Sequence, residues 1–168
     1  MSSTRRISIE PLTPKAFSPY GTVVAATEEA EHFPINQGRT QRFHALAKVE
    51  VLGEGAEAIL SIFRGQPVQP LLIELMERHP LGSQAFVPLN GEPFYAVVAP
   101  PGDFDENAVR AFYVAGDQGI NFAAGTWHAP LLPLNANADY LVVDRRGAGN
   151  NCDEVTLTQP IELQPDSL

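Results

Sequence analysis

Residues 84–99 read QAFVPLNGEPFYAVVA, in which two runs of apolar, aromatic and β-branched residues lie on either side of Asn90-Gly91. Runs of this composition favour β-strands. Asn-Gly is typical of the tight turn between two antiparallel strands, because both residues adopt positive φ readily. The stretch therefore predicts two strands, residues 84–89 and 92–99, joined as a hairpin.

Further short β-like runs lie before and after this pair. We expect strands at residues 7–12, 22–26, 47–52, 58–64, 71–75, 108–114 and 140–144. The 15 prolines and 13 glycines separate these runs, as in all-β proteins with many turns. A loop is expected at residues 33–39, and helix only near Lys15, Glu28 and Asn107, the first capped by Thr13. The pattern predicts a mainly β fold, a barrel or a sandwich, with a few short helices.

Length and charge limit the function classes. A chain of 168 residues can bury a sizeable core, so we expect one domain over residues 1–168. The net charge of −9 repels phosphate backbones and anionic lipids, so neither a nucleic-acid nor a membrane partner is expected. No run approaches the ~20 apolar residues that span a bilayer. No apolar signal-peptide core follows the N-terminus, so a cytoplasmic protein is expected.

The single cysteine and the arginines narrow the chemistry further. Cys152 has no second cysteine to pair with. It also has no basic neighbour in sequence to favour its thiolate, which disfavours a nucleophilic role. In an acidic protein an anionic substrate needs a local cation, and a guanidinium matches a carboxylate. Four arginines are candidates, with Arg64 preferred because it closes a strongly apolar strand: Arg42, Arg64, Arg78 and Arg145.

Two stretches, residues 77–88 and 119–131, carry residues suited to metal or acid–base chemistry. Glu77 and His79 are two apart, so on a strand they share a face. Gln84 follows a Pro-Leu-Gly turn on what we predict to be the paired strand, and His128 follows a turn. If both stretches line one barrel, a carboxylate, two imidazoles and an amide oxygen converge, a set that can hold a divalent metal. Alternatively, the histidines are structural and bonded within the barrel.

The same residues resemble the two cupin motifs. In the first motif, two histidines two apart are followed five residues later by a glutamate. Here Glu77 replaces the first histidine, His79 matches the second, and Gln84 replaces the glutamate. Gly125 and His128 match the Gly-x-x-His of the second motif. The resemblance implies a cupin-like antiparallel β-barrel, with a metal site formed by Glu77, His79, Gln84 and His128.

The chain as a whole is more closely similar to the ureidoglycolate lyase family. Residues 77–86 are the most specific part of the similarity, which covers nearly the whole chain. The other matching runs are residues 11–12, 17–21, 35–38, 42–47, 64–67, 126–131, 144–145 and 151–153. Family resemblance implies cleavage of ureidoglycolate to glyoxylate and urea, a late step of allantoin catabolism. It also implies a divalent metal, with nickel expected, and a homodimer, which would cover exposed strand edges of a small barrel.

The family resemblance also implies roles for individual residues. Glu77, His79 and His128 are the expected catalytic groups. The expected substrate-binding residues are Asn36, His44, Arg64, Gln84 and Trp127. Chemically, an asparagine can bond a ureido group, a histidine can act as acid or base, and a tryptophan can wall a pocket. Their plainer interpretations are a turn residue, a surface histidine and a core aromatic.

Two other functions fit the same residues. The barrel could hold another enzyme acting on a small hydroxy or sugar acid, such as a metal-dependent oxygenase or an isomerase, because a fold does not determine its chemistry. It could also be a non-catalytic cupin that senses a small acid. Turnover would separate the sensor from both enzymes, and oxygen consumption would identify the oxygenase.

Overall fold

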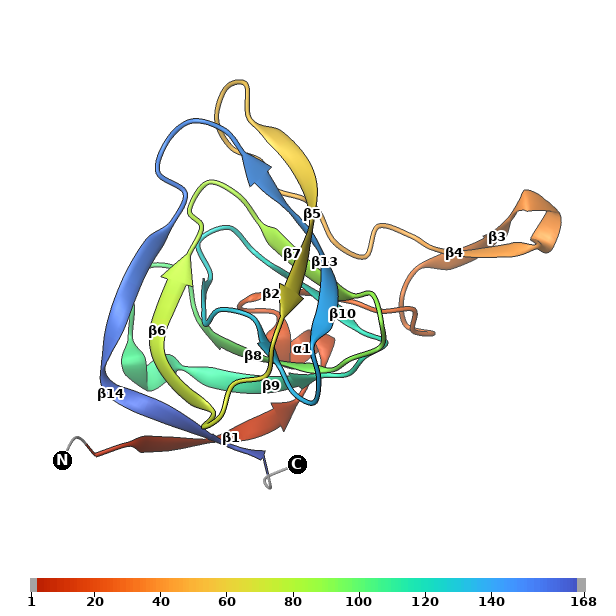
Figure 1. The fold of residues 1–168 in the computed structure, drawn as a ribbon. Helices are drawn as coiled ribbons and strands as arrows, with labels where there is room; N and C mark the ends of the chain where they lie inside the picture. Colours follow the sequence, from red (N-terminus) through yellow and green to blue (C-terminus); the bar gives the residue numbers. More distant parts are fainter. Residues whose placement is uncertain (1–2, 166–168) are drawn as a thin grey trace.

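A computed structural model describes residues 3–165, which form mainly β-strands (Figure 1). One set of strands closes into a ring. Its order is β11 (Trp127–His128), β6 (Leu72–Arg78), β14 (Asp153–Gln164), β1 (Arg5–Pro11), β9 (Arg110–Val114) and β8 (Phe94–Ala99), which pairs back to β11. The short β12 (Leu132–Pro133) adds to β8. Neighbouring strands are antiparallel, except that β1 runs parallel to both β14 and β9.

A second sheet packs against one side of this ring. Its order is β2 (Gly21–Val24), β10 (Gly119–Phe122), β7 (Gln84–Pro88), β13 (Ala138–Arg146) and β5 (Glu57–Gly65). All of its neighbouring strands are antiparallel. The predicted mainly β barrel with a few short helices is therefore confirmed, and the parallel pairings of β1 are the departure from a purely antiparallel arrangement.

Strand β8 lies between two apolar cores, and every one of its residues is buried. Tyr95 and Val97 belong to the cluster inside the ring. Phe94 and Val98 belong to the cluster between the ring and the second sheet. Successive side chains of a strand point to opposite faces, so an all-apolar strand suits this doubly covered position. The layer between the ring and the second sheet is where the candidate site lies.

A short helix closes one end of this layer. In α1 (Pro14–Phe17) the Thr13 hydroxyl accepts a hydrogen bond from the amide of Ala16, and proline occupies the first turn. Phe17 is fully buried, with its ring 5.6 Å from Phe112. The predicted cap and helix are confirmed here, and the segment near Asn107 forms the 3₁₀ turn η2 (Glu106–Ala108). Near Glu28 the chain forms a turn rather than a helix.

A two-stranded arm projects from the body (Figure 1). It consists of β3 (His32–Ile35) and β4 (Thr40–Phe43), joined by the 3₁₀ turn η1 (Asn36–Gly38). Asn36, Gln37 and Gly38 all have positive φ, which reverses the chain in few residues. We expected a loop at residues 33–39. That expectation is confirmed for residues 36–39 but was wrong for residues 33–35, because the turn-forming residues are confined to the tip and the flanking residues pair with one another.

Two other expectations about strands need correction. Residues 84–89 and 92–99 are strands but not a hairpin, because β7 pairs with β10 and β13 whereas β8 pairs with β9, β11 and β12. The turn at Asn90-Gly91 instead carries the chain from one sheet to the other. Residues 47–52 form only an isolated bridge between Val51 and Gly82.

The sequence also left strands unpredicted. β10, β11, β12 and β14 were not expected, because glycine, proline or polar residues interrupt their apolar pattern. Within residues 3–165, no helix is long and apolar enough to cross a membrane.

Candidate active site

Three chemically active side chains meet between the ring and the second sheet. Glu77 on β6 and His128 on β11 are direct partners across the two strands, so their side chains share a face. His79 follows directly after β6. One ligand atom from each residue lies within 4.8 Å of the others. The predicted convergence of the two stretches is therefore confirmed for these three residues, here called the Glu77 cluster.

Glu77 lies between the two imidazoles. Its Oε1 is 3.6 Å from Nε2 of His128 and 4.0 Å from Nε2 of His79. The two rings are 5.1 Å apart between centroids. His128 is almost wholly buried, whereas about a quarter of the Glu77 side chain is exposed. The cluster thus combines a buried imidazole with a carboxylate that solvent or a ligand can reach.

Backbone carbonyls fix the orientation of both rings. Nδ1 of His79 lies 2.7 Å from the carbonyl oxygen of Asn151, and Nδ1 of His128 lies 3.0 Å from that of Thr126. A carbonyl only accepts hydrogen bonds, so each Nδ1 carries the proton. Each Nε2 is left buried without a hydrogen-bond partner among the described residues. Both lone pairs are thus available on the Glu77 side of the rings.

The charge distribution of the cluster favours a cation between Glu77 and the two imidazoles. When Nε2 of His128 is protonated, its hydrogen bond and charge, with a smaller contribution from His79, lower the pKa of Glu77 despite the opposing effect of burial. An ionised carboxylate facing two imidazole lone pairs is repulsive unless a proton or a metal ion lies among them. The arrangement therefore suits either an imidazolium or a bound divalent ion.

A stacked aromatic ring holds His128 from behind. Phe122 on β10 lies parallel to it, with 4.4 Å between ring centroids and an interplanar angle of 11°. Phe122 is the register partner of Gln84 on β7, so both side chains project from the same face of the second sheet. Gln84 therefore projects from the face that packs against His128.

Gln84 presents a free acceptor. Its Nε2 donates a hydrogen bond to Asp144, and because a carboxylate only accepts, this contact sets the orientation of the amide. The opposite atom, Oε1, is buried with no hydrogen-bond partner within residues 3–165. We predicted that β6 and β7 would pair; they do not, and Gln84 reaches this layer from the second sheet instead.

Cys152 is another polar neighbour of Glu77. Its Sγ lies 3.9 Å from Oε2 of Glu77. Burial, followed by the charges of Glu77 and its acidic neighbours, raises the pKa of the thiol. A protonated thiol is a weak donor and a poor nucleophile, which agrees with the prediction that Cys152 is not the nucleophile.

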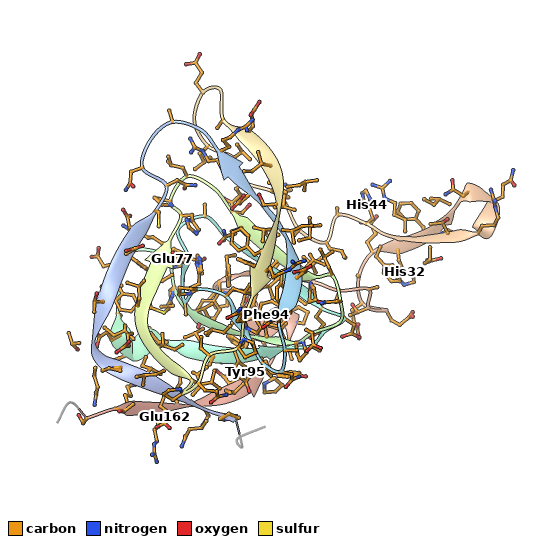
Figure 2. All side chains as sticks on the ribbon, in the orientation of Figure 1. His32, His44, Glu77, Phe94, Tyr95 and Glu162 are labelled. Carbon is orange, nitrogen blue, oxygen red and sulfur yellow. The ribbon has the colours of Figure 1, made fainter. Side chains whose placement is uncertain are left out.

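The structure does not bring three of the expected substrate-binding groups to this cluster. Trp127 neighbours His128 on β11 but points to the opposite face, into the apolar cluster inside the ring, where its indole donates to the carbonyl of Gly102. Asn36 and His44 lie at the tip and the base of the arm. In Figure 2, His32 and His44 lie along the arm, well away from Glu77.

The arginine that we preferred as the carboxylate-binding residue is already paired with an acidic side chain. Arg64, the preferred candidate, lies on the edge strand β5 with 77 % of its side chain exposed, and it forms a two-point pair with Asp139. That contact raises the pKa of Arg64 and lowers the pKa of Asp139. Sequence gave no sign of this partner, which is 75 positions away.

Sequence reasoning missed the residues that hold the cluster together. Phe122 stacks on His128, and Asn151 holds both His79 and the following turn, accepting from the amide of Leu81. Residues 151–153 belong to the runs that resemble the ureidoglycolate lyase family, so the signal for Asn151 was present. Phe122 lies in an unpredicted strand, and no local pattern marks it.

Comparison with known proteins identifies relatives over the whole chain. The family model described as ureidoglycolate lyase matches residues 4–164. Proteins named ureidoglycolate lyase from Burkholderia mallei (strain NCTC 10229) and Chelativorans sp. (strain BNC1) are 49 % and 51 % identical, covering 98 % and 95 % of this chain and 96 % of each relative. One of the same name from Pseudomonas syringae pv. syringae (strain B728a) is 54 % identical, with 89 % of both chains covered.

Similarity to solved structures is smaller. RmlC from Streptococcus suis in complex with dTDP-D-xylose has a TM-score of 0.38 and 12 % sequence identity, over 77 % of this chain and 73 % of that one. This similarity is too small to support an inference about the site.

Proposed function

This chain belongs to the ureidoglycolate lyase family, and we propose that it cleaves ureidoglycolate to glyoxylate and urea at the Glu77 cluster. The observation that carries the proposal is the convergence of one carboxylate and two imidazole nitrogens within 4.8 Å. This set provides a proton acceptor, a proton donor and a cation-binding centre in one place. The reaction belongs to the catabolism of allantoin, and hence of purines.

The chemistry requires one proton to move and one bond to break. In the substrate, a single carbon bears a hydroxyl, a carboxylate and a ureido nitrogen. Removal of the hydroxyl proton lets that oxygen form the carbonyl of glyoxylate, while the carbon–nitrogen bond breaks and its electron pair goes to nitrogen. The departing nitrogen takes up the proton and leaves as urea. A positioned acid–base group contributes about 10²–10⁴ in rate to such a transfer.

One arrangement of these residues uses His128 to carry the proton. Its Nε2 has an available lone pair and accepts the hydroxyl proton, and Glu77, 3.6 Å away, stabilises the resulting imidazolium. The same nitrogen then returns the proton to the departing ureido nitrogen. Because the Thr126 carbonyl accepts from Nδ1 and Phe122 stacks on the ring, the imidazole keeps its orientation during both steps.

A second arrangement of the same residues holds a divalent metal, and the donor set fits one. Nε2 of His79, Nε2 of His128 and Oε1 of Gln84 are buried acceptors without partners within residues 3–165, and Glu77 adds a negative charge. Imidazole and carboxylate or amide oxygen ligands suit nickel and other first-row ions. When bound, the ion supplies positive charge that favours ionisation of the substrate hydroxyl. Activity after treatment with a chelator, and after addition of nickel, distinguishes the two arrangements.

The products test the reaction. Racemic ureidoglycolate incubated with the protein should release urea and glyoxylate, with no ammonia. Hydrolysis of the ureido carbonyl, which releases ammonia, commonly uses a water activated by two metal ions. Within residues 3–165 the only clusters of possible ligands share Glu77, so a separate second centre is not available. Stoichiometric ammonia in the absence of urease would contradict the proposal.

We also propose that the protein is a homodimer formed through the outer face of the second sheet. Leu60 and Ile62 on β5 are 72 % and 62 % exposed. Their register partners on β13, Val143 and Leu141, share the same face. Contiguous exposed apolar surface of this kind marks an interface. Light scattering should give the mass of two chains, and Leu60→Asp should shift the mass toward that of one chain.

The cytoplasm is the proposed location. Cys152 is a free, exposed cysteine, and free thiols persist in reducing compartments. Fractionation of cells should recover the activity with cytoplasmic marker enzymes, and recovery in an extracellular or membrane fraction would contradict this location.

A further inference from the structure

The four candidate arginines differ in how far their guanidinium groups are already engaged. Arg64 is paired with Asp139. Arg78 binds Asp153 and the carbonyl of Gly102, and Arg145 binds the carbonyls of Leu52 and Ala148. Arg42 is exposed and makes no hydrogen bond or ion pair with any residue in the described range 3–165. Of the four, Arg42 therefore has the guanidinium that is free to bind a substrate carboxylate.

Arg42 lies on the arm, however, and not beside the Glu77 cluster of its own chain. It pairs across β3 and β4 with Phe33, and Ile35 pairs with Thr40, so these side chains share one face of the arm. Phe33 and Ile35 are only partly covered. Figure 2 shows that the arm, marked by His32 and His44, projects away from the side of the body that carries Glu77. This face combines apolar side chains with a free cation.

The arm lacks support from its own body. Among residues 3–165, β3 and β4 pair only with one another. An isolated two-stranded hairpin is marginally stable in water, and its tip has two non-glycine residues at positive φ, Asn36 and Gln37. Such conformations persist where surrounding contacts hold them, and they are frequent at functional sites. Pairing with the other strands of the described chain therefore does not stabilise the arm.

The segment that follows the arm leads to the side of the body where we place the dimer contact. Asn121 on β10 lies between two residues of the apolar core, Ile120 and Phe122, so its side chain points to the outer face of the second sheet. There its Nδ2 donates to the carbonyl of Lys48. The segment that follows the arm thus crosses the same outer face on its way to β5, which carries Leu60 and Ile62.

We propose that in the dimer the arm of each chain packs against the second copy, where Arg42 binds the carboxylate of the substrate held at the partner's Glu77 cluster. The charges are complementary, because Arg39 and Arg42 lie on the arm of a protein with a net charge of −9. Asn36, at the tip of the same arm, reaches the partner's site with it. Each site is therefore composite, with the cluster from one chain and the arm from the other. The inference rests on the proposed function for the identity of the ligand.

A mixed dimer tests whether the arm acts between chains. Arg42→Ala and His128→Ala chains with different affinity tags are co-expressed, and the dimer that carries both tags is purified. One of its two sites combines the intact cluster of the Arg42→Ala chain with the intact arm of the His128→Ala chain. The mixed dimer should therefore show about half of the wild-type activity per dimer. The Arg42→Ala homodimer should lose about 10- to 100-fold in kcat/KM, from the loss of a charged hydrogen bond.

Controls separate the ways in which this test can fail. Arg6→Ala removes an exposed arginine from a surface pair with Glu162 and should leave the activity unchanged. A mixed dimer no more active than the average of its parent homodimers, with active wild-type protein, would overturn the inference. If the wild-type protein releases no urea, the proposed reaction is wrong, and hydrogen exchange then tests the arm. Backbone amides of residues 32–43 should be protected in the dimer; exchange at the rate of an unstructured peptide would overturn the inference.

Discussion

Two histidine–glutamate pairs in this molecule have the same separation but very different surroundings. Nε2 of His128 lies 3.6 Å from Glu77, and Nε2 of His32 lies 3.6 Å from Glu28. Glu28 is 93 % exposed, on a turn at the base of the arm, whereas Glu77 is 23 % exposed. Solvent screens the outer pair, and such surface pairs contribute little. Burial and the second imidazole distinguish the inner pair as a site.

The largest expected difference between the two pairs is in catalysis. Glu77→Gln keeps the size of the side chain but removes its charge, and should lower kcat/KM by about 10²–10⁴. Glu28→Gln makes the same change in the outer pair and should leave kcat/KM unchanged. Steady-state kinetics with ureidoglycolate measure both variants. Equal effects of the two substitutions would mean that the Glu77 cluster is not the active site.

The next effect is on metal binding. Gln84→Leu removes the free acceptor Oε1 and should weaken nickel binding by at least ~10-fold, as measured by calorimetry on protein stripped with a chelator. Gln159→Leu is the matched control, because the amide of Gln159 bonds only to Ser3 among the described residues. Unchanged nickel affinity in Gln84→Leu would remove Gln84 from the ligand set.

A smaller effect concerns stability against acid. The pKa of Glu77 is lowered from 4.5, so its stabilising contribution is present above pH 4.5 and is lost as the pH falls through the lower, folded-state pKa. The metal-free wild-type protein should therefore lose more of its free energy of unfolding over this range than Glu77→Gln does. Urea unfolding of both proteins above and below pH 4.5 measures the difference, and parallel curves would contradict it.

The smallest effect is expected at Cys152. Its thiol is held protonated and only borders Glu77. Cys152→Ser replaces the thiol, a weak donor, with a hydroxyl of similar size. The substitution should change kcat/KM by no more than about threefold. Alkylation of the wild-type thiol at neutral pH should also be slow. Loss of activity in Cys152→Ser as large as in Glu77→Gln would give the thiol a chemical role.

Local patterns predicted much of this molecule but not its pairings. Thr13 and Pro14 started a helix as expected, and Glu77 and His79 share a site as their spacing indicated. Arg64 was preferred because it ends an apolar strand, but its partner Asp139 is 75 positions away. Trp127 was expected beside the substrate, yet strand alternation directs it to the face opposite His128. These errors share one cause: the partner of a side chain on a strand depends on which strand lies beside it.

The sequence by itself determined the composition of the site and the mainly β character of the chain, since turn residues and the alternation of apolar side chains act over a few positions. Only the tertiary structure decided that β11 lies between β6 and β8, which brings His128 opposite Glu77. It also decided that Asn90-Gly91 connects two sheets, and that Arg42 projects on an arm with a free guanidinium. Such arrangements depend on contacts between residues far apart in the chain, and their free energy comes from burial of the whole core, which no short segment encodes.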